Sequence, residues 1–313
     1  MRNLRIPRAV KVPGGILGLI ILYWILYRDT KPDESKTTIF DVASTNFRYP
    51  HSYPYLTQPG AGLCGTDKVE VLIMVSSALK HTERRRAIRE TWGASSNLIP
   101  HNIKIFFMLG TTQELNPTLE SDLLKESLEF SDIVREQFID SYSNLTLKSI
   151  GGIKWTRQFC SQAKFFMKTD DDIYLNIPML IRFLRSAEPR SRVIHGCVKN
   201  GPQGSHQPIS VSGASFTSVH PPFTAGAGYI ISGDIIQELS NASQNIKIIR
   251  VEDAFLTGHC ASRVGGIQRV HNNIFSCGQL VNRNCDMKTR ITGHKITSER
   301  MRIIQDELEN NIC

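Results

Sequence analysis

From residue 68 onward, apolar runs of strand length alternate with longer amphipathic segments, and this alternation limits the fold more than any other feature of the chain. Short runs rich in Val, Ile and Phe are typical of strands that are buried on both faces of a sheet. Three runs are predicted as strands: Val69–Ser76, Ile103–Gly110 and Lys164–Thr169. Three segments between them are predicted as helices: Glu83–Trp92, Thr118–Phe130 and Leu145–Cys160. Strands alternating with helices predict an α/β domain with a mostly parallel, Rossmann-like sheet.

The second half of the chain continues this pattern less regularly. Two more strands are predicted, at Arg192–Val198 and Gly228–Ser232. Three more helices are predicted: one from Gly233, one over Glu252–Arg263 and one over Thr297–Glu309. Residues 199–222 are rich in Gly, Pro and Ser, and a loop of this length predicts a substrate-facing role.

Three consecutive aspartates, Asp170 to Asp172, directly follow one of the buried strands. In open α/β sheets, ligands bind outside the carboxyl ends of the strands, so the triplet is predicted to lie at the functional edge. Alternate side chains of an extended chain point the same way, which places Asp170 and Asp172 on one side and Asp171 on the other. Two converging carboxylates favour Mg²⁺ or Mn²⁺ shared with a diphosphate. The alternative is an acidic turn that caps the next helix.

An uncharged apolar run of 16 residues, Val12 to Tyr27, precedes the domain. As a helix it would span roughly 24 Å, which suits the thinner membranes of the early secretory pathway. The alternative is a cleavable signal peptide, but no small-x-small cleavage site follows the run. We therefore expect an uncleaved signal anchor in a single-pass type II membrane protein. Its expected parts are a cytosolic tail at 1–11, a transmembrane helix at 12–27, a stem at 28–66 and a lumenal domain at 67–313.

The position of the net charge bears on the class of partner. The chain carries +8, and half of this excess lies in the first 36 residues, around the apolar run. The remaining +4 shows no basic stripe with interleaved aromatic residues, so we expect no nucleic-acid partner.

Cysteine usage indicates the compartment. The seven cysteines show no CxxC spacing, which favours an oxidised lumenal domain over a cytosolic or metal-binding one. Two N-glycosylation triplets, which begin at Asn144 and Asn241, agree with this location. Because seven is odd, at least one thiol stays free or pairs between chains, so a homodimer is among the expected states.

Five motifs occur in a fixed order along the domain. They are Arg85–Gly93 (RRAIRETWG), Phe107–Gly110 (FMLG), Phe138–Lys148 (FIDSYSNLTLK), Lys168–Asp172 (KTDDD) and Glu252–Gly258 (EDAFLTG). Together they resemble the β-1,3-galactosyltransferase and β-1,3-N-acetylglucosaminyltransferase family, which are Golgi type II hexosyltransferases with a GT-A fold. The resemblance covers roughly residues 64–300.

On the donor side, the resemblance implies a UDP-sugar whose phosphates are bridged by Mn²⁺ or Mg²⁺. The implied metal ligands are Asp170, Asp172 and His294, and Asp171 is implied on the donor side as well. For a histidine such as His294, the alternative is an ordinary surface or core position.

Further donor contacts are implied at three pairs of residues. Arg85 and Arg89 lie four apart on one helix face and would clamp phosphate or uridine oxygens, with solvated charge as the alternative. Asp140 and Lys148 match positions where the family contacts nucleotide. Gly226 and Gly228 match a glycine-rich segment where the backbone approaches the donor sugar, with tight packing as an equal alternative. Trp92, by contrast, is expected in the core.

On the acceptor side, the resemblance makes Asp253 the catalytic base that takes the proton of the acceptor hydroxyl. Glu252 either raises the pKa of Asp253 or binds the acceptor sugar, and the sequence leaves both open. The alternative for the pair is two exposed acids at the start of a helix.

The resemblance also implies two disulfides, Cys64–Cys160 and Cys260–Cys285. It leaves three cysteines unassigned: Cys197, Cys277 and Cys313.

The sequence thus predicts a Golgi-membrane, inverting β-1,3-glycosyltransferase. It would move galactose, N-acetylglucosamine or N-acetylgalactosamine from a UDP-sugar to a hydroxyl of a glycan acceptor on a glycoprotein or glycolipid. The alternative is a catalytically inactive lumenal protein that binds UDP or a glycan on the same scaffold.

Overall fold

The computed structural model describes residues 53–60, 62, 64–65, 69–114, 116–200, 209–211, 214–216 and 220–312. The predicted membrane helix at 12–27 and most of the predicted stem lie outside these residues. Within the described ranges, no helix combines the length and apolar character that crossing a membrane requires.

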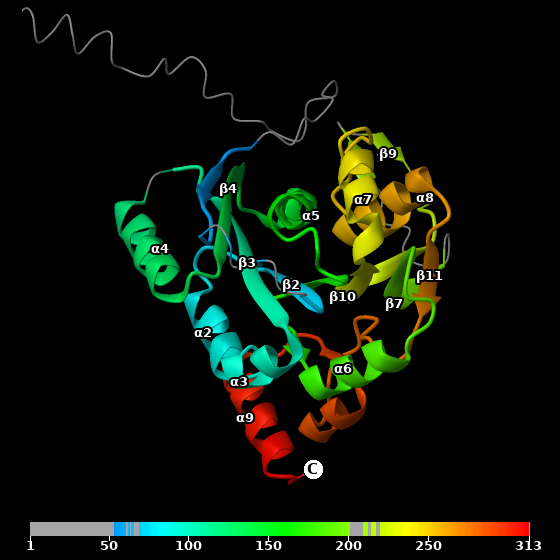
Figure 1. Ribbon diagram of the computed structural model, residues 1–313. Helices are drawn as coiled ribbons and strands as arrows, with labels where there is room; N and C mark the ends of the chain where they lie inside the picture. Colours follow the sequence, from blue (N-terminus) through cyan, green and yellow to red (C-terminus); the bar gives the residue numbers. More distant parts are fainter. Residues whose placement is uncertain are drawn as a thin grey trace, which may run out of the picture. The chain divides into compact units, whose positions relative to one another are not determined.

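An eight-stranded mixed sheet forms the centre of the domain, in the order β1-β4-β3-β2-β5-β10-β7-β11 (Figure 1). Its strands are β1 (Tyr55–Thr57), β2 (Val71–Ser76), β3 (Ile103–Thr111), β4 (Ile133–Ile139), β5 (Phe165–Asp170), β7 (Val193–Lys199), β10 (Phe223–Ser232) and β11 (Gln268–His271). The neighbours β4, β3, β2 and β5 run parallel, whereas β10 is antiparallel to both β5 and β7. The three apolar runs near the start of the domain are confirmed as strands, and they form neighbours in the parallel centre.

The parallel centre is apolar because both of its faces are covered. All six residues of β2 are buried. Val71, Ile73 and Val75 belong to the large core cluster on one face. On the other face, α5 packs so closely that a Cβ added to Gly152 would lie 2.9 Å from Met74 Cγ. Strands covered on both faces carry continuous apolar runs, and for this reason the sequence pattern located them.

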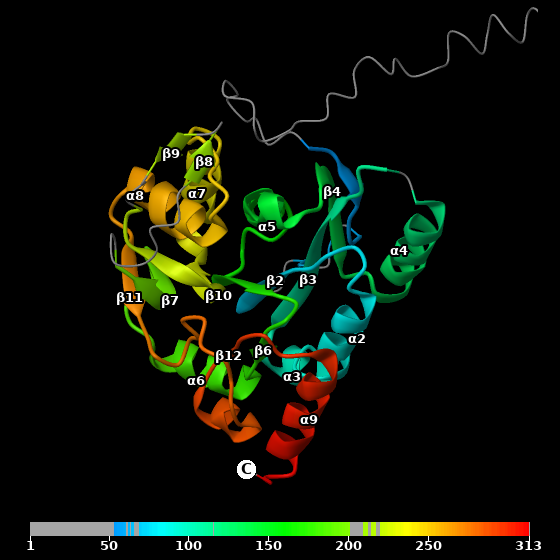
Figure 2. The ribbon, with the colours of Figure 1, turned by 180° about the vertical axis from the view of Figure 1, so that it is seen from behind.

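The helices flank the sheet on both sides. They are α2 (Thr82–Glu90), α3 (Ser95–Leu98), α4 (Pro117–Phe130), α5 (Leu145–Phe159), α6 (Ile177–Ser186), α7 (Ile236–Ser243), α8 (Ala261–Val264) and α9 (Ser298–Glu309). Figures 1 and 2 agree that α5 and α7 lie on one side of the sheet and α2, α3, α6 and α9 on the other. The predicted helix at Glu252–Arg263 is a π-helical turn, Ala254–Cys260, followed by α8.

Two helices begin at a shared local signal. Asn116 accepts a hydrogen bond from the Leu119 amide at the start of α4, and Asn176 accepts one from the Met179 amide at the start of α6. Each helix also has a proline in its first two positions. An Asn cap satisfies an amide without a helical partner, and proline there loses no hydrogen bond.

Residues before the predicted domain boundary at 67 belong to this sheet. Strand β1 pairs antiparallel with β4, with Tyr55 opposite Glu136. The Cys64–Cys160 disulfide ties the following turn to the end of α5. The edge of the sheet is therefore covered by chain that the sequence pattern assigned to the stem.

The disulfides partly correct the expectation from the sequence. Cys64–Cys160 is present as predicted. Cys260–Cys285 is wrong, because Cys260 is a buried free thiol in the π-helical turn and Cys285 is disulfide-bonded elsewhere. A second bond, Cys197–Cys277, links the end of β7 to the segment that follows β11.

Two small sheets lie beside the main one. Strands β8 (Ile209–Val211) and β9 (Ala214–Phe216) form a hairpin within the predicted substrate-facing loop. Strands β6 (Tyr174–Leu175) and β12 (Thr292–Gly293) pair antiparallel. The β6–β12 pairing brings the chain around residue 294 back to the acidic triplet.

Candidate active site

The acidic triplet lies where β5 leaves the parallel centre, as predicted. Asp170 is the last residue of β5 and pairs in register with Ser76 of β2. The Asp171 amide then donates to the Ser76 carbonyl at 3.1 Å. The carboxylates therefore stand at the carboxyl edge of the sheet, where open α/β folds place their ligands.

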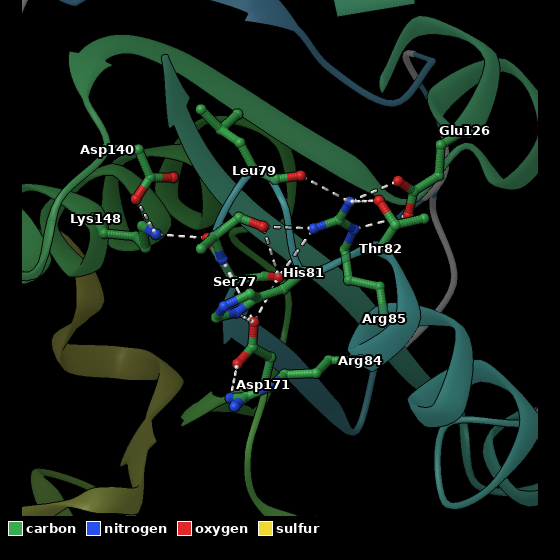
Figure 3. Close-up of polar contacts among 11 residues, drawn as sticks. Ser77, Leu79, His81, Thr82, Arg84, Arg85, Glu126, Asp140, Lys148 and Asp171 are labelled. Atoms are coloured by element: carbon green, nitrogen blue, oxygen red, sulfur yellow. Dashed lines mark hydrogen bonds and ion pairs between the residues drawn. The ribbon is translucent and has the colours of Figure 1, made fainter. Parts of the chain in front are cut away.

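Asp171 is held inside the protein. The residue is 5% exposed, and its carboxylate accepts hydrogen bonds from Ser77 Oγ at 2.8 Å and Arg84 Nη1 at 3.0 Å (Figure 3). His81 Nδ1 lies 2.8 Å from the same carboxylate. Burial opposes ionisation, but these partners outweigh it and hold the pKa of Asp171 below its ordinary value. Asp171 thus anchors the connection between β2 and α2.

Arg85 supports the same connection from the other side. It is fully buried, and Nε and Nη2 donate to the Glu126 carboxylate at 2.7 and 2.6 Å. Nη1 donates to Ser77 Oγ at 3.1 Å and to the Ala78 carbonyl at 2.7 Å (Figure 3). Arg85 was predicted to bind the nucleotide-sugar donor, but its guanidinium donates to acceptors within the protein.

Arg89 lies one helical turn further along α2 and is held in a similar way. It forms a two-point contact with Asp132, with both distances 2.8 Å, and reaches Glu126 at 2.9 Å. Its guanidinium also stacks on the ring of Phe130, 4.0 Å from the centroid. The two arginines share one helix face as predicted, and they share Glu126.

Asp140 and Lys148 form a buried ion pair beside the β2–α2 connection. Lys148 is 2% exposed, and its Nζ lies 2.8 Å from Asp140 Oδ1 and also donates to the Ser77 carbonyl (Figure 3). Asp140 Oδ2 accepts from the Gly110 amide at 3.0 Å. Ser77 is thus fixed by Arg85, Lys148 and Asp171 together. The resemblance implied that Asp140 and Lys148 contact the nucleotide, whereas in the structure they pair with each other and hold the β2–α2 connection at the edge of the site.

Lys168 joins three elements at the centre of the edge. Its side chain is 3% exposed, and its Nζ lies 2.8 Å from Asp170 Oδ1 and 3.0 Å from Glu252 Oε2. It also donates to the Gly226 carbonyl at 3.2 Å. The other oxygen of Glu252 accepts a 2.6 Å bond from the hydroxyl of Tyr229, which is completely buried. Glu252 therefore has both carboxylate oxygens on protein partners, which favours its electrostatic role over acceptor binding.

Asp253 stands next to this group at the start of the π-helical turn. Oδ2 accepts from the Gly226 amide at 2.8 Å, and Oδ1 accepts from the Ala254 amide at 2.9 Å. Burial raises the pKa of Asp253 to about 6, and the neighbouring Glu252 carboxylate acts in the same direction. A carboxylate whose pKa lies near neutrality is suited to accept a proton during catalysis.

The glycine segment of β10 fits closely between these groups. The pairing of β10 with β7 is irregular between Thr224 and Tyr229, so the strand bends at the two glycines. A Cβ at Gly226 would lie 3.4 Å from Asp253 Oδ2, and one at Gly228 would lie 2.8 Å from Thr292 Cγ2. The Gly226 main chain lies beside Asp253, with its amide on the Asp253 carboxylate and its carbonyl on Lys168. Packing explains Gly228 at least as well as donor contact does.

The segment that carries His294 runs beside the acidic triplet. Gly293 pairs with Tyr174 in the β6–β12 sheet, and the Ile296 amide donates to the Asp172 carbonyl at 2.8 Å. His294 Nδ1 is buried and has no hydrogen-bond partner. Yet in the described part of the chain, no three His, Cys, Asp or Glu side chains are grouped closely enough to hold a metal ion.

Charge nevertheless favours a cation at this edge. Among Lys168, Asp170, Glu252 and Asp253, one side chain is cationic and three are anionic. Burial raises the pKa of Asp170, and the Glu252 and Asp172 carboxylates add to this against the Lys168 ammonium. An excess of carboxylates together with an unpartnered imidazole is a donor set that fits Mn²⁺ or Mg²⁺ in chemical type.

The two predicted glycosylation sites differ in their surroundings. The Asn144 side-chain amide donates to the Ile139 carbonyl at 2.8 Å and is partly buried. Asn241 lies exposed on α7, and its Oδ1 accepts from Gln237 and Arg157. Of the two predicted sites, Asn241 is therefore the more accessible one.

Three residues of the site were not singled out from the sequence: Lys168, Tyr229 and His81. A signal existed for Lys168, because a lysine that directly follows the apolar residues FFM in a strand predicted to be buried requires a buried partner. Tyr229 follows the glycine segment directly but gave no independent signal. His81 precedes α2 and its contact with Asp171 spans 90 residues of sequence, a separation that local patterns do not reveal.

Comparisons with known proteins place this geometry in context. Residues 83–273 match the family described as Galactosyltransferase. The mouse protein named β-1,3-galactosyltransferase 1 is 34% identical over 304 residues, which cover 91% of this chain and 89% of the relative. β-1,3-galactosyltransferase 5 of Pan paniscus is 32% identical over 301 residues, 94% of this chain and 95% of the relative. A solved glycosyltransferase involved in glycosylation of the major capsid of PBCV-1 aligns with 74% of this chain and 99% of its own, at 12% identity and a TM-score of 0.43.

Proposed function

Because the chain belongs to the galactosyltransferase family and is a glycosyltransferase, we propose that it transfers galactose from UDP-galactose to a hydroxyl of a glycan acceptor, with inversion and a β-1,3 linkage. The relatives' names support galactose ahead of the N-acetylhexosamines. The acceptor is proposed only as a class, a glycan on a glycoprotein or glycolipid.

The observation that carries this proposal is the position of Asp253. Its carboxylate is fixed by two main-chain amides, has a raised pKa, and stands beside the glycine bend and the acidic edge. In the proposed step, the acceptor oxygen attacks the anomeric carbon from the Asp253 side. The hydroxyl proton passes to the Asp253 carboxylate while the bond from the anomeric carbon to the UDP oxygen breaks. Fixing the carboxylate holds it within reach of that proton.

We propose that the donor diphosphate lies at the carboxyl edge near Asp170 and Asp172. Asp171, Arg85, Asp140 and Lys148 would shape this pocket indirectly, because their side chains fix the Ser77 connection. The main chain of the glycine bend at Gly226 would lie beside the donor sugar. Arg89 would brace α2 through Asp132 and Glu126.

Asp170, Asp172 and His294 would hold a divalent cation at this edge. When bound, Mn²⁺ or Mg²⁺ would supply Lewis-acid stabilisation to the leaving diphosphate. The excess negative charge and the unpartnered His294 Nδ1 support this assignment. In the structure as described, Asp170 is paired with Lys168.

We further propose a GT-A architecture and a Golgi location with the domain in the lumen. The Cys64–Cys160 and Cys197–Cys277 disulfides agree with an oxidising compartment. The type II signal anchor at 12–27 stays a prediction from the sequence, as does a homodimer.

Transfer can be tested with the full-length chain purified in detergent. UDP-galactose, UDP-N-acetylglucosamine and UDP-N-acetylgalactosamine, each radiolabelled, are offered with β-linked N-acetylglucosamine and galactose acceptors, with and without EDTA. We expect transfer from UDP-galactose, a β-1,3-linked product, and loss of transfer with EDTA that Mn²⁺ restores. Binding of UDP with no transfer from any donor would instead support the inactive UDP-binding alternative.

A further inference from the structure

The three partners of Lys168 belong to three different elements. Asp170 ends β5, the Gly226 carbonyl lies in the bend of β10, and Glu252 begins the π-helical turn. Gly226 thus accepts a hydrogen bond from Lys168 through its carbonyl and donates one to Asp253 through its amide. Lys168 therefore contacts both the Gly226 main chain, which is bonded to Asp253, and the side chain of Glu252, which precedes Asp253 in the chain.

Glu252 is fixed rather than free to turn toward a substrate. Tyr229 pairs with Lys168 in the antiparallel register of β10 and β5. Its hydroxyl donates to Glu252 Oε1 at 2.6 Å, while Lys168 holds Oε2 at 3.0 Å. All three side chains are nearly or completely buried. Interactions between charges in such a place are screened little by solvent, so they act strongly on a neighbouring carboxylate.

We propose that Lys168, Glu252 and Tyr229 form a positioning unit for Asp253, in which Glu252 and Lys168 act on its carboxylate with opposite sign and Tyr229 fixes Glu252. This inference rests on the proposed role of Asp253 as the base. The titratable groups that act on Asp253 or respond to its charge are Lys168 of β5, Glu252 before the turn and Tyr229 of β10. Asp170 of β5 is linked to them through its ion pair with Lys168. None of the three members of the unit needs to touch the substrate.

The unit makes two predictions of opposite direction. The Glu252 carboxylate repels the ionised form of Asp253, so Glu252→Gln lowers the pKa of Asp253. The Lys168 ammonium attracts that form, so Lys168→Met raises it. A purely structural role for either residue would lower activity without moving the pH at which the base titrates.

The test is the pH profile of kcat/KM for the full-length chain with saturating UDP-galactose and varied acceptor. We expect the acidic limb to move down by about one pH unit in Glu252→Gln and up by about one unit in Lys168→Met. Tyr229→Phe removes a hydrogen bond that favours the ionised form of Glu252, so it should move the limb down, in the direction of Glu252→Gln, by a smaller amount. If Lys168→Met does not fold, Lys168→Gln takes its place, because glutamine removes the charge and keeps a hydrogen-bond donor for Asp170 and Glu252; it should also move the limb up.

A second Lys–Glu pair, in which the glutamate is buried and the lysine partly buried, provides the matched control. Lys154 Nζ lies 2.7 Å from Glu136, which is 2% exposed, on α5 and β4 away from Asp253. Glu136→Gln and Lys154→Met should alter stability and leave the acidic limb in place.

Asp253→Asn separates the two hypotheses. If Asp253→Asn keeps the wild-type limb, the base assignment fails and the proposed function must change. If Asp253→Asn abolishes transfer while the limb stays fixed in both Glu252→Gln and Lys168→Met, or moves the same way in both, the positioning unit is overturned and the base assignment stands.

Discussion

The Gly226 amide donates a 2.8 Å hydrogen bond to Asp253 Oδ2, across 27 residues of sequence. This bond joins the bend of β10 to the start of the π-helical turn at the point where both meet the acidic end of β5. The candidate base is therefore held by main chain, whose position depends on how the glycine segment packs.

Gly228 tests how tightly that segment is packed. Its φ is +155°, and a Cβ there would lie 2.8 Å from Thr292 Cγ2. We expect Gly228→Ala to lower the free energy of unfolding by about 1–3 kcal/mol through overpacking. Adding Thr292→Ser removes the clashing methyl and keeps the hydroxyl that accepts from the Ser276 amide. In urea unfolding, the double variant should recover part of the loss; fully additive losses would show that this contact is not the cause.

The substitution Arg85→Lys tests whether the Arg85 guanidinium stabilises the fold or binds the sugar donor. Lysine cannot replace its contacts with Glu126, Ser77 and Ala78, so Arg85→Lys should lower the free energy of unfolding by about 2–4 kcal/mol. Arg86→Lys is the matched control, because Arg86 is 63% exposed and should change stability by less than about 0.5 kcal/mol. A raised KM for UDP-galactose with unchanged stability in Arg85→Lys would instead indicate direct donor contact.

Much of the fold was readable because it depends on local patterns. The apolar runs of β2, β3 and β5 located the parallel centre, whereas the glycine segment, which was expected to precede a strand at Gly228–Ser232, lies inside the longer strand β10. Strand β1 was missed because residues 55–57 are only partly buried and gain their structure from pairing with β4. No short-range signal marks such a pairing.

The candidate site divides in the same way. Residue types located the acidic edge, since three adjacent carboxylates after a buried strand need an explanation, and the family resemblance pointed to the Glu252–Asp253 pair. Side-chain partners could not be assigned, because those of Arg85 and Glu252 come from distant parts of the chain. The predicted Cys260–Cys285 disulfide was wrong for a related reason, because the pairing of cysteines depends on which of them the fold brings together.

A partly buried histidine pair should make stability depend on pH. His220 Nδ1 lies 3.1 Å from His259 Nε2, just before β10 and within the π-helical turn. Burial lowers the pKa of both, and for His259 the charge of His220 adds to this. The unfolded chain binds protons below about pH 6.5 while the folded pair resists them, so stability should fall as the pH drops through that value toward the lowered pKa values.

The measurement is the free energy of unfolding at pH 7.5 and pH 5.5. His259→Gln should lose less stability on acidification than the wild type, whereas His101→Gln, outside the pair, should behave like the wild type. An equal loss in His259→Gln and the wild type would rule out the pair as the source.

The disulfide pattern can be checked by mapping peptides after alkylation without reduction. Cys260 should be alkylated, and Cys197 should be recovered linked to Cys277. Removing that bond with Cys197→Ala and Cys277→Ala should lower the free energy of unfolding by about 2–4 kcal/mol, against about 1 kcal/mol for Cys260→Ala. A recovered Cys260–Cys285 peptide would contradict the structure.

Asp253→Asn tests the central claim most directly, because asparagine keeps the size of the side chain and removes its ability to take a proton. Transfer from UDP-galactose and UDP binding are measured side by side on the full-length chain, with the thermal unfolding temperature as a check on folding. We predict that kcat falls by about 10²–10⁴-fold while UDP affinity changes by less than about twofold. Transfer at the wild-type rate by a folded, UDP-binding Asp253→Asn variant would contradict the account.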